Sequence, residues 1–436
     1  MPKPAKGFQP TLIPPLIKRN ITLFALSQSF TGAGMQFAYG LGPLMVIALT
    51  GSSALAGLTV ALIGLSRFLV SYPVGKITDT YGRKPGILFG LVLALVGSVL
   101  IWHSVNIHSF ALLFGSMLIF GMGMNAAHQL RVAATDMFPP QKRAQALGYI
   151  AMGALVGLVV SPTVISTAEA VAPRLGQEPL GLPWLLLPVL IVIGMALVFF
   201  VHPDPKEIGM HLERYYPGYT PPPPPTGERA NFSALTILRN GPILLAIIAN
   251  CATQANMSII MVLTSLVLRH HGHSLGAIAL SHMFHSGGMF AFTLPLGKLA
   301  DRFGRDKVMF PGVLTALIGA ALVAYTGQFW SVTLGTFLVG LGWAGANVAA
   351  TAMIADHVET EERGRAIGVN ESCAGAVSVT VALVTGPLIQ GYGLPTAGSV
   401  AVLVSLPPLL IWLTRRLRER LARRRVETAL VEAETP

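Results

Sequence analysis

Methionine and histidine side chains recur at helical spacing in one part of the chain. Met257 and Met261 are four positions apart, as are His285 and Met289, and His282 precedes His285 by three. Residues three or four apart share one face of a helix, so two adjacent helices would join three thioethers and one or two imidazoles. Thioethers and imidazoles suit copper, and thioethers suit Cu(I) in particular. We therefore expect these five residues to bind copper.

A structural role for the same residues is the alternative. Methionine fills irregular gaps between packed helices, and a buried histidine is often only a hydrogen-bonded core residue. The neighbouring Gly287 and Gly288 also suit ordinary packing between membrane helices. Each spacing occurs once, close to chance expectation for a chain of 436 residues with 16 Met and 11 His. The spacing alone therefore leaves both interpretations open.

These methionines and histidines fall in long apolar segments. The chain is 53% hydrophobic and only 11% charged, whereas a soluble protein is nearer a quarter charged. Apolar runs of about 20 residues recur, and a helix of that length crosses a bilayer. We predict an all-α polytopic membrane protein with twelve transmembrane helices in two pseudo-symmetric six-helix bundles. The predicted spans run over residues 21–49, 54–74, 86–104, 109–135, 144–168, 183–201, 242–268, 276–296, 308–326, 330–355, 365–389 and 394–414.

Basic residues are concentrated on one side of the predicted membrane. Of the 30 Lys and Arg residues, only Arg174 and Arg269 fall in loops of the opposite side, and only Arg67 and Arg131 fall inside spans. Basic loops stay in the cytoplasm, so we expect a multi-pass protein of the cytoplasmic membrane with both termini cytoplasmic. Topology also accounts for the net charge of +11, and we expect no nucleic-acid partner.

A charged loop with two glycines occurs twice. Residues 75–84 read GKITDTYGRK after the second predicted span, and residues 297–307 read GKLADRFGRDK after the eighth. Charges of this kind are costly in hydrocarbon, so each loop must lie at a membrane surface between two spans.

A second motif is duplicated in the same register. Asp136 and Arg143 follow span 4, and Asp356 and Arg363 follow span 10. Two matched motifs predict a six-plus-six duplication, and transporters built from such repeats bind substrate at the midplane between them. We expect bundles at residues 1–201 and 241–414, with a cytoplasmic linker at 202–240 and a basic tail at 415–436.

The duplicated motifs resemble those of the major facilitator superfamily. The resemblance implies two bundles that rock about a central cavity, with a cytoplasmic side held shut by charged loop residues. By this analogy Asp79 meets the start of span 11, and Arg83 pairs with Asp136. The expected gating residues are Asp79, Arg83, Asp136, Arg143, Asp301, Arg305, Asp356 and Arg363.

Spans 7 and 8 are similar to those of the CcoA-like copper importers of this superfamily, which carry Met-x-x-x-Met and His-x-x-x-Met there. That resemblance implies Met257, Met261, His285 and Met289 as copper ligands. Span 5 carries Ser161-Pro162 where many antiporters of the superfamily carry Gly-Pro. This departure weakens a drug-antiporter assignment.

Ionisable groups inside the spans mark functional sites by default. Arg67 in span 2 and Glu371 in span 11 lie on helices that face each other in this fold, and we expect an ion pair between the bundles there. Separate local pairs are the alternative. His128 and Arg131 near the inner end of span 4 either line a polar cavity or let Arg131 reach the cytoplasmic surface.

The linker and the tail have distinctive compositions. Pro221 to Pro225 predict an extended spacer without a packed core. Seven arginines between residues 415 and 425 predict a cationic helix that rests on anionic lipids.

Three functions stay open at this point. The leading one is secondary transport of a small solute by alternating access, with copper import as its most specific form. The second is a proton-coupled exporter or importer of small organic compounds, with His128, His282, His285 or Glu371 carrying the proton. The third is a non-transporting membrane sensor or assembly factor that kept the fold. The sequence carries no Walker-type phosphate loop, catalytic triad or zinc-hydrolase motif, so we expect neither an enzyme nor a bound cofactor.

Overall fold

The computed structural model describes residues 13–139, 142–220, 234–358 and 363–434. These residues are almost entirely helical and contain no strand. The first bundle consists of α1 (Pro15–Thr31), α2 (Ala33–Thr50), η1 (Ser53–Leu55), α3 (Leu58–Tyr81), α4 (Arg83–Asn106), α5 (Phe110–Ala127), α6 (Gln129–Asp136), α7 (Arg143–Val171), η3 (Ala172–Leu175) and α8 (Leu182–Phe199). The second consists of α12 (Gly241–His270), α13 (Leu275–Ala291), α14 (Thr293–Phe303), α15 (Asp306–Tyr325), α16 (Phe329–Asp356), α17 (Arg363–Tyr392) and α18 (Leu394–Glu434).

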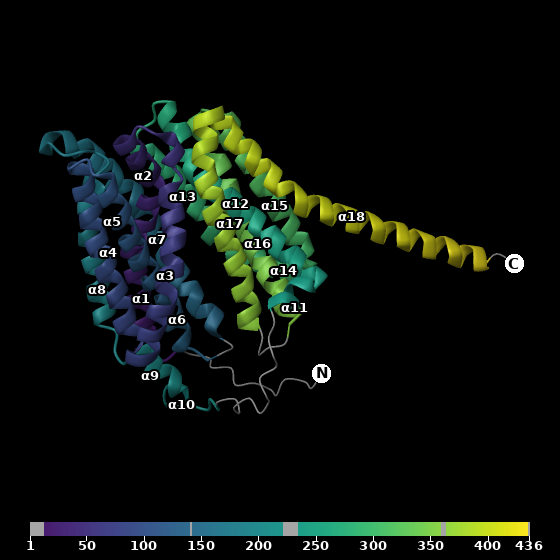
Figure 1. Cartoon of the computed structure of the whole chain (residues 1–436). Coiled ribbons are helices and arrows are strands. Elements are labelled where there is room, and N and C mark those ends of the chain that lie inside the picture. Colours follow the sequence, from purple (N-terminus) through teal and green to yellow (C-terminus); the bar gives the residue numbers. More distant parts are fainter. Residues whose placement is uncertain (1–12, 140–141, 221–233, 359–362, 435–436) are drawn as a thin grey trace.

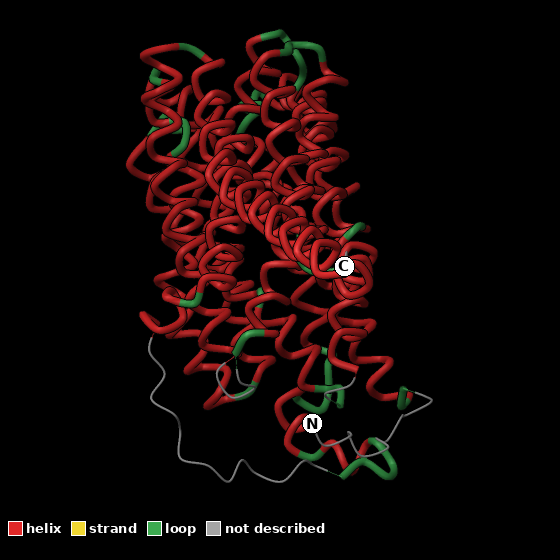
Figure 2. The backbone as a smooth tube through the Cα atoms, turned by 90° about the vertical axis from the view of Figure 1, so that its right-hand side faces the viewer, coloured by secondary structure: helices red, strands yellow, loops and turns green. Residues whose placement is uncertain are grey.

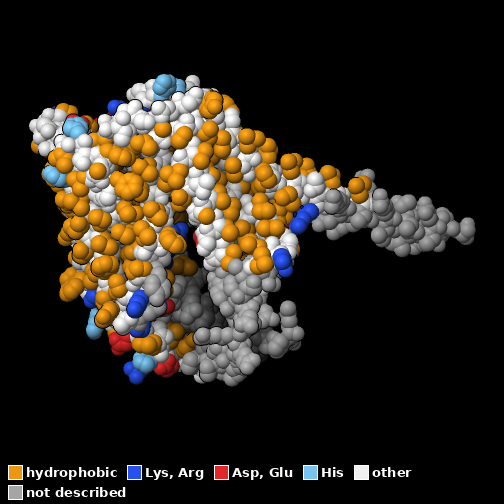
Figure 3. Space-filling model, in the orientation of Figure 1, with side chains coloured by type: hydrophobic (Ala, Val, Ile, Leu, Met, Phe, Trp, Pro, Cys, Tyr) orange, Lys and Arg blue, Asp and Glu red, His pale blue; other side chains and the backbone are white. Residues whose placement is uncertain are grey.

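The predicted spans all appear as helices. In the described part of the chain, 11 helical stretches are long and apolar enough to cross a membrane. The remaining predicted span, the eighth, is divided at Phe292 into α13, with 17 residues, and α14. Large apolar side chains such as Val156, Val189 and Leu334 are exposed on the outer surface, which is orange in Figure 3. The expected all-helical membrane fold is confirmed.

The duplicated loops are tight turns that require glycine. Gly82 separates α3 from α4 with φ at 112°, and Gly304 separates α14 from α15 with φ at 102°. A side chain at either φ is strained, so both copies of the motif keep glycine at this place. The repeated sequence motif thus corresponds to a repeated backbone turn.

Short helices α9 (Pro205–Met210), α10 (Leu212–Tyr215) and α11 (Ala234–Arg239) lie between the bundles in sequence. Ile208 and Tyr216 are buried against the first bundle, and the Tyr216 hydroxyl donates to the Met137 carbonyl at 3.1 Å. The first part of the predicted linker is therefore packed, while Pro221 to Pro225 lie outside the described residues. Helix α18 continues the last span without a break and projects from the bundle (Figure 1).

The two bundles touch along α7 with α13, α3 with α17, and α2 with α12 and α13. The side view of Figure 2 shows helices along one common direction, with loops gathered at the two ends. At the end where α7 finishes, which we call the outer end, the bundles are in close contact. Figure 3 shows a hollow between the halves towards the opposite end, which carries α9 and α10 and which we call the basic end.

Candidate functional site

A cavity of about 390 Å³ lies between the bundles, within the range of roughly 300–1,000 Å³ typical of small-molecule sites. Helices of both bundles line this cavity, so any change in the relative position of the bundles alters its shape. The side chains used below come from α3, α5, α6 and the α5–α6 junction, and from α12, α13, α16 and α17. They are Arg67, Asn125, His128, Arg131, Gln254, Met257, Met261, His285, Met289, Phe290, Trp343, Asn347, Glu371 and Ala374.

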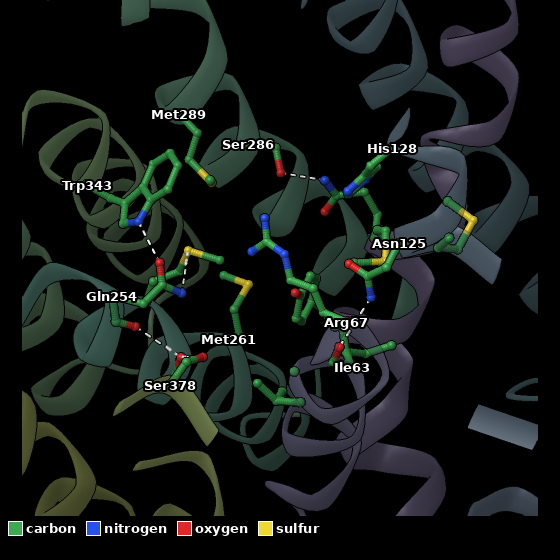
Figure 4. A pocket seen from close by; sticks show the side chains of 18 of the residues that line it. Ile63, Arg67, Asn125, His128, Gln254, Met261, Ser286, Met289, Trp343 and Ser378 are labelled. Atoms are coloured by element: carbon green, nitrogen blue, oxygen red, sulfur yellow. Dashed lines mark hydrogen bonds between the residues drawn. The ribbon is translucent and has the colours of Figure 1, made fainter. Parts of the chain in front are cut away.

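The wall from the first bundle carries the basic groups. His128 stands at the junction where α5 ends and α6 begins, and Arg131 follows on α6. The Arg131 guanidinium carbon lies 6.0 Å from the centre of the Phe290 ring on α13. In Figure 4 the Arg67 side chain points into the cavity between Asn125 and His128 on one side and Met261 on the other. Two guanidiniums thus face the same space.

The wall from the second bundle carries amide, indole and thioether side chains. The Trp343 indole Nε1 donates to Gln254 Oε1 at 2.9 Å, and Gln254 Nε2 lies 4.0 Å from the sulfur of Met257. Both contacts are drawn in Figure 4. Because the Gln254 amide bonds on both sides, it holds the indole and the thioether in fixed positions.

A buried amide network lies behind this wall. Asn250 Nδ2 donates to Asn370 Oδ1 at 3.2 Å, and Asn347 Nδ2 donates to Asn250 Oδ1 at 3.1 Å. Asn370 Nδ2 in turn lies 3.4 Å from Glu371 Oε1. These three asparagines from α12, α16 and α17 were not singled out by sequence analysis. Polar residues inside predicted spans are the signal that marks them.

The structure brings Met257, Met261, His285 and Met289 to this cavity. His285 Nδ1 lies 2.9 Å from the Thr336 carbonyl, which can only accept, so Nδ1 carries the proton and Nε2 is an acceptor. His285 Nε2 is buried and finds no hydrogen-bond partner among the described residues. The predicted thioether and imidazole residues therefore line one space, and one buried imidazole nitrogen there has no hydrogen-bond partner among the described residues.

His282 has a different place. It is buried at the seam between the bundles and is not among the residues that line the cavity. The Ser265 hydroxyl donates to the Gly40 carbonyl at 2.9 Å, so His282 Nε2, at 3.0 Å, must donate to Ser265. Within the described ranges no three His, Cys, Asp or Glu side chains cluster as a metal site, so metal binding here would depend on the thioethers.

Arg67 and Glu371 line the cavity from opposite bundles. Arg67 lies on α3 and Glu371 on α17, the helix pair that forms one seam of the interface. Their direct pairing stays a prediction.

The loop motifs form ion pairs within each bundle. Arg83 Nε lies 2.7 Å from Asp136 Oδ2, and Arg305 Nε lies 3.0 Å from Asp356 Oδ2. Arg305 also pairs with Asp301, and hydrogen bonds to Asp356 and Asp301 raise the pKa of its guanidinium. The side chains of Asp79, Arg143 and Arg363 lie outside the described parts, so their gating contacts stay predictions.

Asp204 joins the first loop motif and was not expected there. Its carboxylate accepts from the backbone N–H of Arg83 at 3.0 Å, of Lys84 at 2.9 Å and of Lys206 at 2.9 Å. It therefore caps α4 and α9 together. Asp before Pro205 is a sequence signal for the start of α9, but its reach to α4 depends on tertiary packing.

The outer end is closed by contacts between the bundles. Glu169 on α7 accepts from the backbone N–H of Leu275 and Gly276, both at 3.0 Å, at the start of α13. A Cβ added at Gly57 would lie 1.7 Å from the Ala382 carbonyl oxygen across the seam. Only glycine permits this approach, so the two bundles are in close contact at this seam.

Comparisons with known proteins agree with this architecture. The chain is 28% identical over 403 residues to YdeG of Bacillus subtilis (strain 168), an uncharacterized MFS-type transporter, covering 91% of this chain and 92% of that protein. It is 27% identical over 408 residues to the riboflavin transporter RfnT of Brucella anthropi, covering 90% and 96%.

Solved structures show the same fold. A bacterial homologue of the iron transporter ferroportin superposes with a TM-score of 0.67 at 15% identity, covering 91% of this chain and 98% of that one. The nucleoside transporter NupG superposes with a TM-score of 0.64 at 14% identity, covering 92% and 98%. The family model described as Major Facilitator Superfamily matches residues 24–281 and 245–433. The chain therefore belongs to the Major Facilitator Superfamily.

Proposed function

We propose that this transporter moves a small polar organic solute by alternating access through the cavity between its bundles. The observation that carries the proposal is a cavity lined by both halves, closed at the outer end by contacts such as that of Glu169 with the start of α13. Sliding or rocking at the seam would expose the same side chains to the other end. The riboflavin transporter, 27% identical over 408 residues, is named for an organic solute.

The basic end is assigned to the cytoplasm, because Lys and Arg are retained there. In this orientation both termini are cytoplasmic and the cavity faces inward. The pairs Arg83–Asp136 and Arg305–Asp356 then lie at the cytoplasmic surface, where they stabilise the loops that meet when this side closes. Arg415 and Arg416 of α18, which lie next to Gly241 and Asp306 on the same side, suit anionic lipid headgroups.

The test is transport by the purified full chain in proteoliposomes. Vesicles are incubated with a mixture of cell metabolites under a proton gradient of either sign, and their contents are analysed by mass spectrometry. Gly57→Leu is the control, because its side chain would meet Ala382 and prevent closure of the outer end. We expect an organic compound to change concentration only with the native chain. Identical contents in both vesicle samples would contradict the proposal.

Copper import is the second candidate, favoured by the shared position of Met257, Met261, His285 and Met289 on the cavity. Under this candidate, the buried and unpartnered Nε2 of His285 would supply the imidazole ligand. The family match supports the superfamily and not its copper-importing subtype. A Cu(I) ion would also add positive charge to a cavity that already holds Arg67 and Arg131.

Uptake of Cu(I) tests this second candidate. Copper import predicts that Met257→Ala and His285→Ala each lower uptake by roughly tenfold or more, as expected for loss of one metal ligand or its support. Metal content of the purified chain after loading with Cu(I) provides the direct measurement. Uptake at the native rate in both variants would exclude copper as the cargo of this site.

A further inference from the structure

The two walls of the cavity differ in charge. Arg67 and Arg131 both come from the first bundle, and Glu371, from the second, is the only Asp or Glu among the residues that line the cavity. With its histidines neutral, the lining of the described cavity therefore carries a net charge of +1. Both guanidinium side chains are exposed to the cavity, and opposite charges attract across such a site, so this lining favours a solute that brings negative charge.

Guanidinium groups also select the chemistry of that charge. Arginine presents a planar set of donors that matches a carboxylate or phosphate group with two parallel hydrogen bonds. A cation in the same space would raise the net charge instead of neutralising it, and direct juxtaposition of like charges costs several kcal/mol. The first wall therefore fits an anionic group.

The opposite wall fits a flat apolar body. Trp343 is held by its bond to Gln254 at 2.9 Å, so its ring offers a fixed surface. Met257 and Met261 lie on the same face of α12 and add polarizable sulfur beside it. Aromatic rings stack on indole, and thioethers make favourable contacts with ring edges. These groups recognise a planar ring more readily than a sugar-like chain.

We infer that the solute is an organic anion with a planar ring system. Its acidic group binds Arg67 and Arg131, and its ring lies against Trp343 and the Met257–Met261 face of α12. This inference rests on the proposed transport of an organic solute and names the class of that solute. The acidic group is a carboxylate or a phosphate, which share this recognition chemistry.

A panel of flat aromatic compounds that differ in charge tests the inference. Proteoliposomes are offered equal amounts of flat aromatic compounds in four forms: 2-naphthoate, 2-naphthyl phosphate, 2-naphthamide and 2-naphthylmethylamine, each with one-ring and three-ring counterparts. We expect accumulation of carboxylate or phosphate members at least tenfold above the amides and amines. Preference for amides or amines, or equal accumulation of all charges, would overturn the inference while leaving transport intact. If a cell metabolite is transported in the mixture assay but no member of this panel accumulates, the inference is overturned and the proposed function stands.

Matched variants identify the groups responsible. Arg67→Gln and Arg131→Gln should each lower accumulation of the anionic members by roughly tenfold, the equivalent of one charge-assisted hydrogen bond. Arg174→Gln, which removes an exposed arginine from an outer loop, is the control and should leave accumulation unchanged. An anion preference that survives both cavity variants would overturn the assignment of the acidic group to these arginines.

The double variant gives a readout that misfolding cannot imitate. With Arg67→Gln and Arg131→Gln combined, Glu371 is the one charge left on the cavity lining, and its net charge becomes negative. We expect the preference to reverse, so that 2-naphthylmethylamine accumulates above 2-naphthoate. Retained preference for the anion, with a native elution profile, would show that these arginines do not select the solute.

Discussion

Two carboxylates hold Arg83 at the start of α4, and the sequence motif predicted only one of them. In the first bundle Arg83 is oriented by Asp136 at 2.7 Å through its side chain and by Asp204 at 3.0 Å through its backbone. Gly82 is constrained by its φ and by the nearby carboxylate, because a Cβ would lie 2.7 Å from Asp204 Oδ2. The turn between α3 and α4 is thus stabilised by Asp204, a residue outside the loop motif that follows α8 in the chain.

At this scale, Asp204→Ala should destabilise the first bundle. The change leaves the N–H groups of Arg83 and Lys84 without their acceptor, and loss of such a cap costs about 0.5–2 kcal/mol. Thermal unfolding in detergent should show a midpoint a few degrees lower. Glu207→Ala is the control, since Glu207 is exposed on the first turn of the same α9. Equal midpoints for the two variants would remove Asp204 from this role.

Helix ends also hold the two bundles together. Helix α7 ends near the start of α13, and Glu169 accepts from two N–H groups there at 3.0 Å. A carboxylate at a helix start meets both unsatisfied donors and the positive end of the helix dipole. This contact joins two rigid elements across the seam, so its strength bears on the equilibrium between open and closed outer ends.

Glu169→Gln should therefore favour opening of the outer end. The amide keeps one acceptor and loses the charge, which weakens the closed state by about 1 kcal/mol and shifts the equilibrium about fivefold. The probe is a cysteine at Ala374, a buried residue on the cavity wall, in a chain with Cys251 and Cys373 replaced by serine. Its labelling by an impermeant maleimide from outside should accelerate.

Glu178→Gln is the matched control, because Glu178 is exposed on the same outer end. It should label at the native rate. If Glu169→Gln labels no faster than this control, the contact does not contribute to closure.

At the scale of the whole molecule, the duplicated sequence forms halves with unlike walls. Both halves repeat the tight glycine turn and the Asp–Arg pair. Their inner surfaces differ, since the first offers Arg67 and Arg131 and the second offers Trp343 and Gln254. In the proposed transport cycle, repetition would serve the motion of the halves, and divergence of the facing side chains would serve recognition of the solute.

Sequence patterns predicted several of the residues that line this cavity but not the complete set. Met257, Met261, His285 and Met289 do face one cavity, as their helical spacing indicated. His282 shares that helix face but lies at the seam with Ser265, because it is about 10 Å nearer than Met289 to the outer end, where α13 packs against the first bundle. Trp343 and the asparagines behind it carried no spacing signal, because their partners are about 90 residues or more away in the chain.

By itself the sequence determined the all-helical membrane fold, its division into two similar halves and the turns between paired helices. These follow from local causes: apolar runs long enough to cross a bilayer, and glycines at positive φ. Tertiary structure alone decided which side chains share the cavity, the capping of α4 by Asp204 and the closure of the outer end by Glu169. Those contacts join segments more than 100 residues apart, and no local pattern encodes how separate helices approach one another.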